Sequence, residues 1–254
     1  AAIGQCCLMN AWTDALAKVD LMPGQVLLTR QDFADHHRSQ KVKETLSNLT
    51  CRKIVPIVNE NDSVSDEEIK FGDNDVLSAL LCSLTGAQLL IILSTAKGLM
   101  THPQAGELIP FVAEISPAIE EMAKGTSSAT AVGGMTTKIE AAKIATKSGC
   151  AVFIGSGENK PDLTNILANK AEGTFFSPTG LDLNQRKKWL AFFPQPKGSI
   201  HIDEGASLAI IDKGSSLLAG GITAVNGKFT EAEVVSLINH KGITIARGVT
   251  RFNT

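Results

Sequence analysis

The sequence lacks a long apolar run and an excess of either charge, and each absence argues against a class of protein. The longest uninterrupted aliphatic stretch, Leu89 to Leu93, is far too short to cross a bilayer. A net charge of −2 and a pI near 6.2 provide no electrostatic reason to expect binding to nucleic acid or to an anionic membrane. We therefore expect no membrane span and no broad affinity for polyanions.

The sequence also lacks a cysteine framework, a targeting leader and a hydrolase pattern. Its five cysteines are odd in number and scattered, which indicates neither paired disulfides nor a metal knuckle. Most lie in apolar sequence, so we expect buried thiols in a reducing, cytoplasmic compartment. The first residues show no basic leader or cleavage pattern of a signal peptide. No Ser/His/Asp or Cys/His constellation is apparent. The cysteines are Cys6, Cys7, Cys51, Cys82 and Cys150.

Apolar segments typical of strands and helices alternate along most of the 254 residues. This order favours a mainly parallel α/β sheet with helices on both faces. Beyond Gly198, short β-like runs separated by glycines indicate a small β-barrel or sandwich. We predict a first domain at residues 1–180, a linker at 181–197 and a second domain at 198–254. Strands are expected at 24–29, 54–58, 88–93, 151–154 and 173–176, and helices at 1–19, 39–48, 75–84, 117–124, 139–148 and 163–168.

Two acid-amide clusters sit at the edges of apolar segments. Asn59-Glu60-Asn61-Asp62 follows the predicted buried strand at 54–58, where open α/β sheets usually bind ligands. Gly72-Asp73-Asn74-Asp75 would form the leading turn of the next helix, where backbone N–H groups favour anions. The alternative is structural: the first cluster forms a turn and the second caps a helix.

A glycine turn, Gly133-Gly134, opens a third candidate segment that continues through Met135, Thr136, Thr137 and Lys138 into an amphipathic helix. Such a turn lets the backbone approach a phosphate closely, and a lysine one turn later supplies a mobile positive charge. The Walker A spacing is absent, so the motif is weak by itself. The alternative is an ordinary surface lysine.

These three motifs, in this order, resemble the amino acid kinase family, and within it the members that phosphorylate the glutamate side chain. The matching segments are NEND at 59–62, FGDNDVLSAL at 71–80 and VGGMTTKIEAA at 132–142. RKKWLAFF at 186–193 continues the likeness, and HIDEGASLAIIDKGSSLLAGGI at 201–222 and GITIARGVTRFN at 242–253 are similar to a PUA domain. The resemblance implies a three-layer α/β/α kinase domain followed by a small β-barrel PUA domain, with both ends of the family pattern missing.

The resemblance also implies a reaction and a role for each matching residue. The γ-phosphoryl group of MgATP would pass to L-glutamate, giving γ-glutamyl phosphate in the first step of proline biosynthesis. Asp62 and Asn74 would bind glutamate, Asp75 would orient catalytic lysines, and Lys138 would stabilise the phosphoryl charge. No protein ligand to the metal is implied. The nucleotide contacts would be Ser94, Thr95, Val132, Gly133, Gly134, Met135, Thr136, Thr137 and Lys138.

Two positions depart from the family pattern: Thr95 replaces an aspartate and Val132 replaces a threonine. If that carboxylate matters, the chain would lose one charge-assisted bond of roughly 1.5–3 kcal/mol. The family's Lys-x-Gly-Ser segment and Ser-Gly-Ala loop would lie before Ala1, so we expect this stretch to be inactive alone. The resemblance further implies feedback inhibition by proline and a homo-oligomer.

Three alternatives remain at this point. The chain could act on another acid, such as aspartate or an acylated glutamate, or it could be a catalytically impaired kinase paralogue. It could also be an RNA-binding protein that acts through its PUA segment. One observation argues against RNA binding. Residues 198–254 contain five Lys/Arg and five Asp/Glu, so they lack the excess of positive charge expected of an RNA-binding surface.

Overall fold

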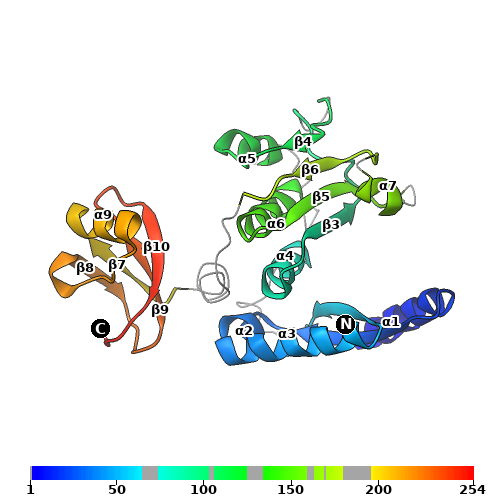
Figure 1. Cartoon of the computed structure of the whole chain (residues 1–254), viewed down its shortest axis with the longest axis horizontal. Helices are drawn as coiled ribbons and strands as arrows, with labels where there is room; N and C mark the ends of the chain where they lie inside the picture. Colours follow the sequence, from blue (N-terminus) through cyan, green and yellow to red (C-terminus); the bar gives the residue numbers. More distant parts are fainter. Residues whose placement is uncertain are drawn as a thin grey trace. The chain divides into compact units, whose positions relative to one another are not determined.

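A computed structural model describes residues 2–64, 74–102, 106–124, 134–158, 163–168, 170–179 and 196–254 of the chain (Figure 1). The chain divides into two compact units, residues 1–184 and 185–254. Among the described residues, no helix combines the length and the apolar character that a membrane crossing requires.

The first unit contains two sheets in its described part. Strands β1 and β2 form a parallel pair, and the second sheet has the order β3-β5-β6-β4. Its β3/β5 and β4/β6 pairs are parallel, whereas β5/β6 is antiparallel. The predicted mixed α/β class is confirmed, but the sheet is less uniformly parallel than expected. The strands are β1 (Met22–Leu28), β2 (Ile54–Glu60), β3 (Leu89–Ser94), β4 (Phe111–Val112), β5 (Ala151–Ser156) and β6 (Thr174–Phe176).

Helices connect these strands, and their ends follow local capping signals. Helix α3 begins at His36, earlier than predicted, because the Asp35 carboxylate accepts a hydrogen bond of 2.8 Å from the Arg38 amide. Helix α6 likewise begins at Met135, directly after Gly134. The helices are α1 (Ala2–Ala17), α2 (Arg30–Ala34), α3 (His36–Cys51), α4 (Asn74–Thr85), α5 (Pro117–Lys124), α6 (Met135–Lys147) and α7 (Leu163–Leu167).

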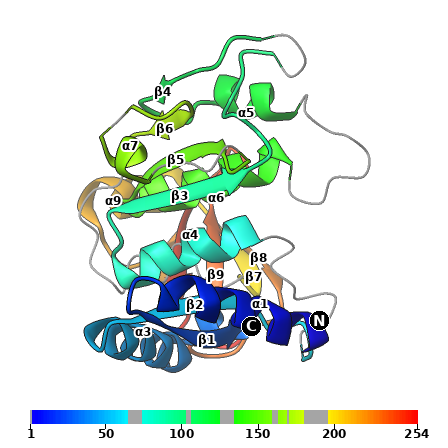
Figure 2. The same cartoon turned by 90° about the vertical axis from the view of Figure 1, so that its right-hand side faces the viewer.

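Small side chains allow helix α6 to pack closely in the core of the first unit. Ala141, Ala142 and Ala145 are fully buried, in one cluster with Ile139 and residues of α4, β3 and β5. Without long side chains between them, the backbones of α4 and α6 can approach each other. Helix α4 also contacts β2 and β3, and Figures 1 and 2 show it between strand β3 and the β1/β2 pair. Helix α4 therefore joins the two sheets.

The expectation that most cysteines are buried is wrong. Cys6, Cys7 and Cys51 are exposed, and only Cys82 and Cys150 lie in the core. The error arises because an apolar neighbourhood in the sequence does not specify whether a helix is covered by other elements: α1, which contains Cys6 and Cys7, has no buried residue. The hydrogen-bonded contact with Cys150, together with burial, raises the pKa of Cys82, so this thiol stays protonated.

In its described residues the second unit is a four-stranded sheet with helix α9 packed against it. The strand order is β10-β9-β7-β8, and the core contains Ile200, Ile202, Val235 and Leu237. The described residues form this sheet and not the closed barrel that the resemblance implies. Helix α9 was not predicted, although an Asp at its N-terminus and a left-handed glycine at its C-terminus mark its ends. The elements are β7 (Gly198–Ile202), α9 (Glu204–Lys213), η2 (Ala219–Gly221), β8 (Ile222–Gly227), β9 (Val234–Ile238) and β10 (Thr244–Val249).

Candidate active site

The centre of the candidate site is a buried ion pair between two helices. Lys138, in the first turn of α6, places its Nζ atom 2.8 Å from Oδ2 of Asp75, in the first turn of α4. The two side chains are only 10% and 14% exposed. A lysine buried to this degree requires a partner charge, because an unpaired charge in the protein interior is costly. The close packing of α4 on α6 supplies that partner from 63 residues away.

The start of helix α6 has the geometry of an anion-binding turn. Gly134 is its N-cap residue and supplies no capping side chain. The Thr137 hydroxyl donates to the Gly134 carbonyl at 2.8 Å, and the Thr136 hydroxyl donates to the Ala123 carbonyl at 3.3 Å. The first amides of a helix have no acceptor inside it, so together with the dipole they favour an anion. Two other predicted residues, Val132 and Gly133, lie outside the described residues.

The hydrogen bonds of the Thr136 and Thr137 hydroxyls bear on their predicted role. Both were predicted to contact the nucleotide, and both hydroxyls donate to backbone carbonyls. Their backbone amides remain the groups best suited to an anion, since they belong to the first turn of the helix. Met135 is buried, so its side chain belongs to the core and only its backbone suits a ligand.

The first acid-amide cluster lies at the carboxyl end of β2. The strand runs two residues further than predicted, so Asn59 and Glu60 belong to it and do not form a separate turn. The Asn61 amide donates to the Leu28 carbonyl at 2.8 Å, which extends the pairing with β1. Asp62 follows and is exposed. A polar cluster at this end of parallel strands lies where α/β sheets usually bind ligands.

Asn74 is the first residue of α4 and is also exposed. Because α4 contacts β2, its first turn and the cluster around Asp62 belong to neighbouring elements. Asp73 lies outside the described residues. Asn74 and Asp75 are adjacent in sequence but differ in their surroundings, since one is exposed and the other is paired with Lys138.

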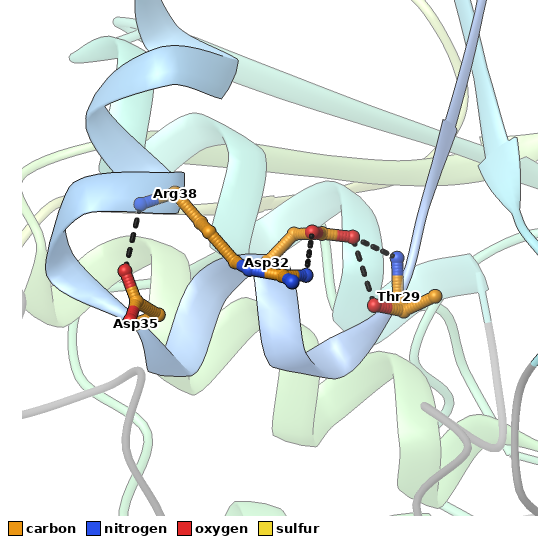
Figure 3. Close-up of polar contacts among 4 residues, drawn as sticks. All are labelled: Thr29, Asp32, Asp35 and Arg38. Atoms are coloured by element: carbon orange, nitrogen blue, oxygen red, sulfur yellow. Dashed lines mark hydrogen bonds and ion pairs between the residues drawn. The ribbon is translucent and has the colours of Figure 1, made fainter.

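The end of β1 carries a polar network that sequence reasoning missed (Figure 3). The Asp32 carboxylate accepts from the amide and the hydroxyl of Thr29, at 2.7 and 2.8 Å, and pairs with Arg38 at 3.1 Å. The signal was present, since a threonine followed three residues later by an acid is a helix-start pattern. The network starts helix α2 directly after β1, beside the cluster at the end of β2.

A second edge with polar side chains lies at the carboxyl ends of β3 and β5. Ser94 is the last residue of β3 and pairs in register with Ser156, the last residue of β5. Each serine hydroxyl accepts from the amide two residues on, at 3.0 Å for Ala96 and 3.2 Å for Glu158. Ser94 is half-buried and Thr95 is exposed. The two strands thus end in matching turns, with Thr95 at the rim.

The predicted residues therefore fall into three groups. Asp75 and Lys138 meet in the buried pair, and Gly134 to Thr137 form the turn that precedes Lys138. Asp62, just past β2, and Asn74, the first residue of α4, are exposed, and Ser94 ends β3 with Thr95 directly after it. No group of three or more His, Cys, Asp or Glu side chains within the described part of the chain could hold a metal ion.

Comparison with known proteins assigns both parts of the chain to families. Residues 1–156 match the model of the amino acid kinase family, and residues 198–254 match that of the PUA domain. Three curated relatives all bear the name glutamate 5-kinase. The protein from Rhizobium johnstonii is 42% identical across 100% of this chain and 66% of its own length. The protein from Aliivibrio fischeri is 43% identical across 100% of this chain and 70% of its own length. The protein from Moorella thermoacetica is 43% identical across 99% of this chain and 68% of its own length. The chain thus spans about two thirds of the length of these relatives.

Proposed function

This chain belongs to the amino acid kinase family, and we propose that its protein transfers the γ-phosphoryl group of ATP to the side-chain carboxylate of L-glutamate. The product would be γ-glutamyl phosphate, the intermediate of the first step of proline biosynthesis. Relatives named glutamate 5-kinase match along the whole chain, PUA segment included, which supports this substrate.

The observation that carries the proposal is the buried pair of Asp75 and Lys138. Phosphoryl transfer needs little covalent help from the protein, because positioning and charge stabilisation supply most of the catalysis. Held by Asp75, the Lys138 ammonium has a defined position, and Lys138 belongs to the same first turn of α6 as the free amides. In the proposed complex the ammonium and these amides would together stabilise the negative charge that develops on the phosphoryl oxygens.

The acceptor needs no general base. A glutamate side chain has an ordinary pKa near 4.3, so its carboxylate is already ionised and nucleophilic at neutral pH. In this proposal Asp62 binds the substrate ammonium and Asn74 its α-carboxylate, which directs the side chain toward the phosphate. Their exposure on neighbouring elements supports a role in binding a ligand that arrives from solvent.

ATP would bind along the carboxyl ends of β3 and β5, contacting Ser94 and Thr95, with its phosphates at the glycine turn. Mg²⁺ commonly keeps several waters and binds through substrate phosphates with one or two carboxylates. When bound, that ion would neutralise charge on the phosphates.

We extend the proposal to the partners that the family resemblance implies: feedback inhibition by proline, a homo-oligomer and a cytoplasmic location. Helix α1 supports association, because it has no buried residue while Ile3 is 85% exposed and Trp12 is 41% exposed. The three alternative functions are not favoured, since the three relatives compared above match 99–100% of the chain and bear the name glutamate 5-kinase.

The test is a substrate comparison with the full-length protein. We expect ATP- and Mg²⁺-dependent release of ADP with L-glutamate and poor turnover of L-aspartate. Aspartate is one methylene shorter, so its carboxylate would fall short of the phosphate when its other groups are anchored at Asp62 and Asn74. Equal turnover of the two acids in a coupled ADP-release assay would overturn the substrate assignment.

A further inference from the structure

A short segment of the first unit crosses the edge at which we propose that ATP binds. It begins at Ser94 at the end of β3, whose carbonyl accepts a 2.8 Å hydrogen bond from the Gly157 amide, just past the end of β5. It ends at Leu99, whose amide donates to the Thr174 hydroxyl at 2.8 Å. Since the sheet order is β3-β5-β6 and Thr174 opens β6, the segment crosses the carboxyl end of β5.

The contact at Thr174 is buried and closely fitted. Thr174 is fully buried and Leu99 is 1% exposed, so water cannot replace the hydroxyl as an acceptor. Gly98 passes directly over it, with a φ of +147° that side chains rarely adopt. A Cβ atom on Gly98 would lie 2.7 Å from the Thr174 hydroxyl oxygen and 2.7 Å from Leu108. The segment can therefore follow this path only with glycine at position 98 and a small hydrogen-bond acceptor at position 174.

Further hydrogen bonds hold the segment at both ends. The Ser94 hydroxyl accepts from the Ala96 amide at 3.0 Å, and the Leu99 carbonyl accepts from the Ile109 amide at 2.8 Å. Between these anchors Thr95 and Lys97 are exposed. The residues available to a ligand thus lie on a strap whose two ends are fixed to the sheet.

We propose that Thr174 is a positioning residue for the nucleotide: by accepting from Leu99, it holds Ser94 and Thr95 in the conformation that binds ATP. The inference rests on the proposed function and adds to it a residue 79 positions beyond Thr95 that touches no substrate itself. A misplacement of about 1 Å at a binding group can lower the rate a hundredfold. Loss of the one hydrogen bond at Thr174 is therefore sufficient to affect nucleotide binding measurably.

The experiment compares Thr174→Val, which removes the acceptor at nearly constant volume, with Thr174→Ser, which keeps it. The matched control is Ser148→Ala, because Ser148 is another buried hydroxyl, bonded to the Ala145 carbonyl at 2.8 Å at the far end of α6. For each full-length variant, calorimetry measures the Kd of a non-hydrolysable ATP analogue. Steady-state kinetics measure KM for ATP and for glutamate, and thermal unfolding measures Tm.

We expect Thr174→Val to weaken analogue binding and raise the KM for ATP about tenfold, while the KM for glutamate stays within twofold. Thr174→Ser should restore nucleotide binding, and Ser148→Ala should leave it unchanged. A Thr174→Val protein with a lower Tm but normal nucleotide affinity would overturn the inference, because the hydroxyl would then serve stability alone.

Three further outcomes distinguish a failure of the inference from a failure to fold and from a failure of the proposed function. Should Thr174→Val fail to fold, Gly98→Ala displaces the same strap from above, and unchanged nucleotide affinity in that variant contradicts the inference. A wild-type protein that binds the analogue but does not phosphorylate glutamate overturns only the substrate assignment. A wild-type protein without affinity for the analogue overturns both.

Discussion

Two ion pairs in the first unit have similar distances and very different surroundings. Asp75 and Lys138 are 2.8 Å apart and almost fully buried, whereas Asp32 and Arg38 are 3.1 Å apart with side chains 22% and 59% exposed. The first pair joins helices from distant parts of the chain, and the second joins residues six positions apart (Figure 3). Solvent screening makes the exposed pair worth little, while the buried lysine depends on its partner. The comparison separates a pair suited to catalysis from a network that defines helix ends.

Lys138→Ala should produce the largest effect. Because this ammonium would act on charge that develops in the transition state, we expect kcat to fall roughly 10²- to 10³-fold with a small change in the KM for glutamate. The matched control is Lys143→Ala on the same helix, a half-exposed lysine paired with Glu120. Steady-state kinetics of both variants check the prediction. A near-normal kcat for Lys138→Ala would mean that the buried pair serves the packing of α4 on α6 and not catalysis.

Asp62→Ala should have the reverse kinetic signature. A carboxylate that binds the substrate ammonium acts in the ground state and in the transition state, so we expect the KM for glutamate to rise while kcat changes little. Loss of one charged hydrogen bond corresponds to a rise of about ten- to a hundredfold. If kcat falls and KM does not change, Asp62 has a different role.

Asp35→Ala should affect stability and leave both kinetic constants unchanged. Removing this cap of α3 should lower the free energy of unfolding by about 1 kcal/mol, a value that solvent exposure keeps modest. The Arg38 amide holds the pKa of Asp35 below its ordinary value of 3.8. The contribution is therefore present above pH 3.8 and lost as the pH falls through the lower folded value.

Denaturant unfolding of wild type and Asp35→Ala, at neutral pH and at steps below pH 4, measures this contribution. The difference between the two proteins should shrink as the pH falls. A difference that stays constant, or a changed kcat, would show that Asp35 is more than a helix cap.

Thr95→Asp should have the smallest effect. The hydrogen bonds of Ser94 already fix the backbone at the end of β3, so we expect nucleotide affinity to stay within about twofold of wild type. Calorimetric titration of both proteins decides the question. A tenfold gain, about 1.4 kcal/mol, would mean that the absent carboxylate matters and that this chain is a weakened kinase.

The sequence predicted most helices and strands of the first unit, because their signals lie within a few neighbouring residues. Helix α5 has the predicted ends, and most other described elements of the first unit differ from prediction by only a few residues. Helix α2 and helix α9 were missed, although capping residues mark both starts. The motifs were also sufficient to indicate the family, because the glycine turn and the two acid-amide clusters are short and contiguous.

What the sequence alone determined is thus the type of each segment and the chemistry of each motif, since capping, periodicity and turn geometry act over a few residues. The tertiary structure decided which motifs meet. The pairing of Asp75 with Lys138 and the anchoring of Leu99 by Thr174 each depend on packing between segments more than sixty residues apart. The exposure of Cys6 and Cys7 likewise depended on tertiary packing, because no residue of α1 is buried. Such contacts arise from long-range burial, which no local pattern specifies.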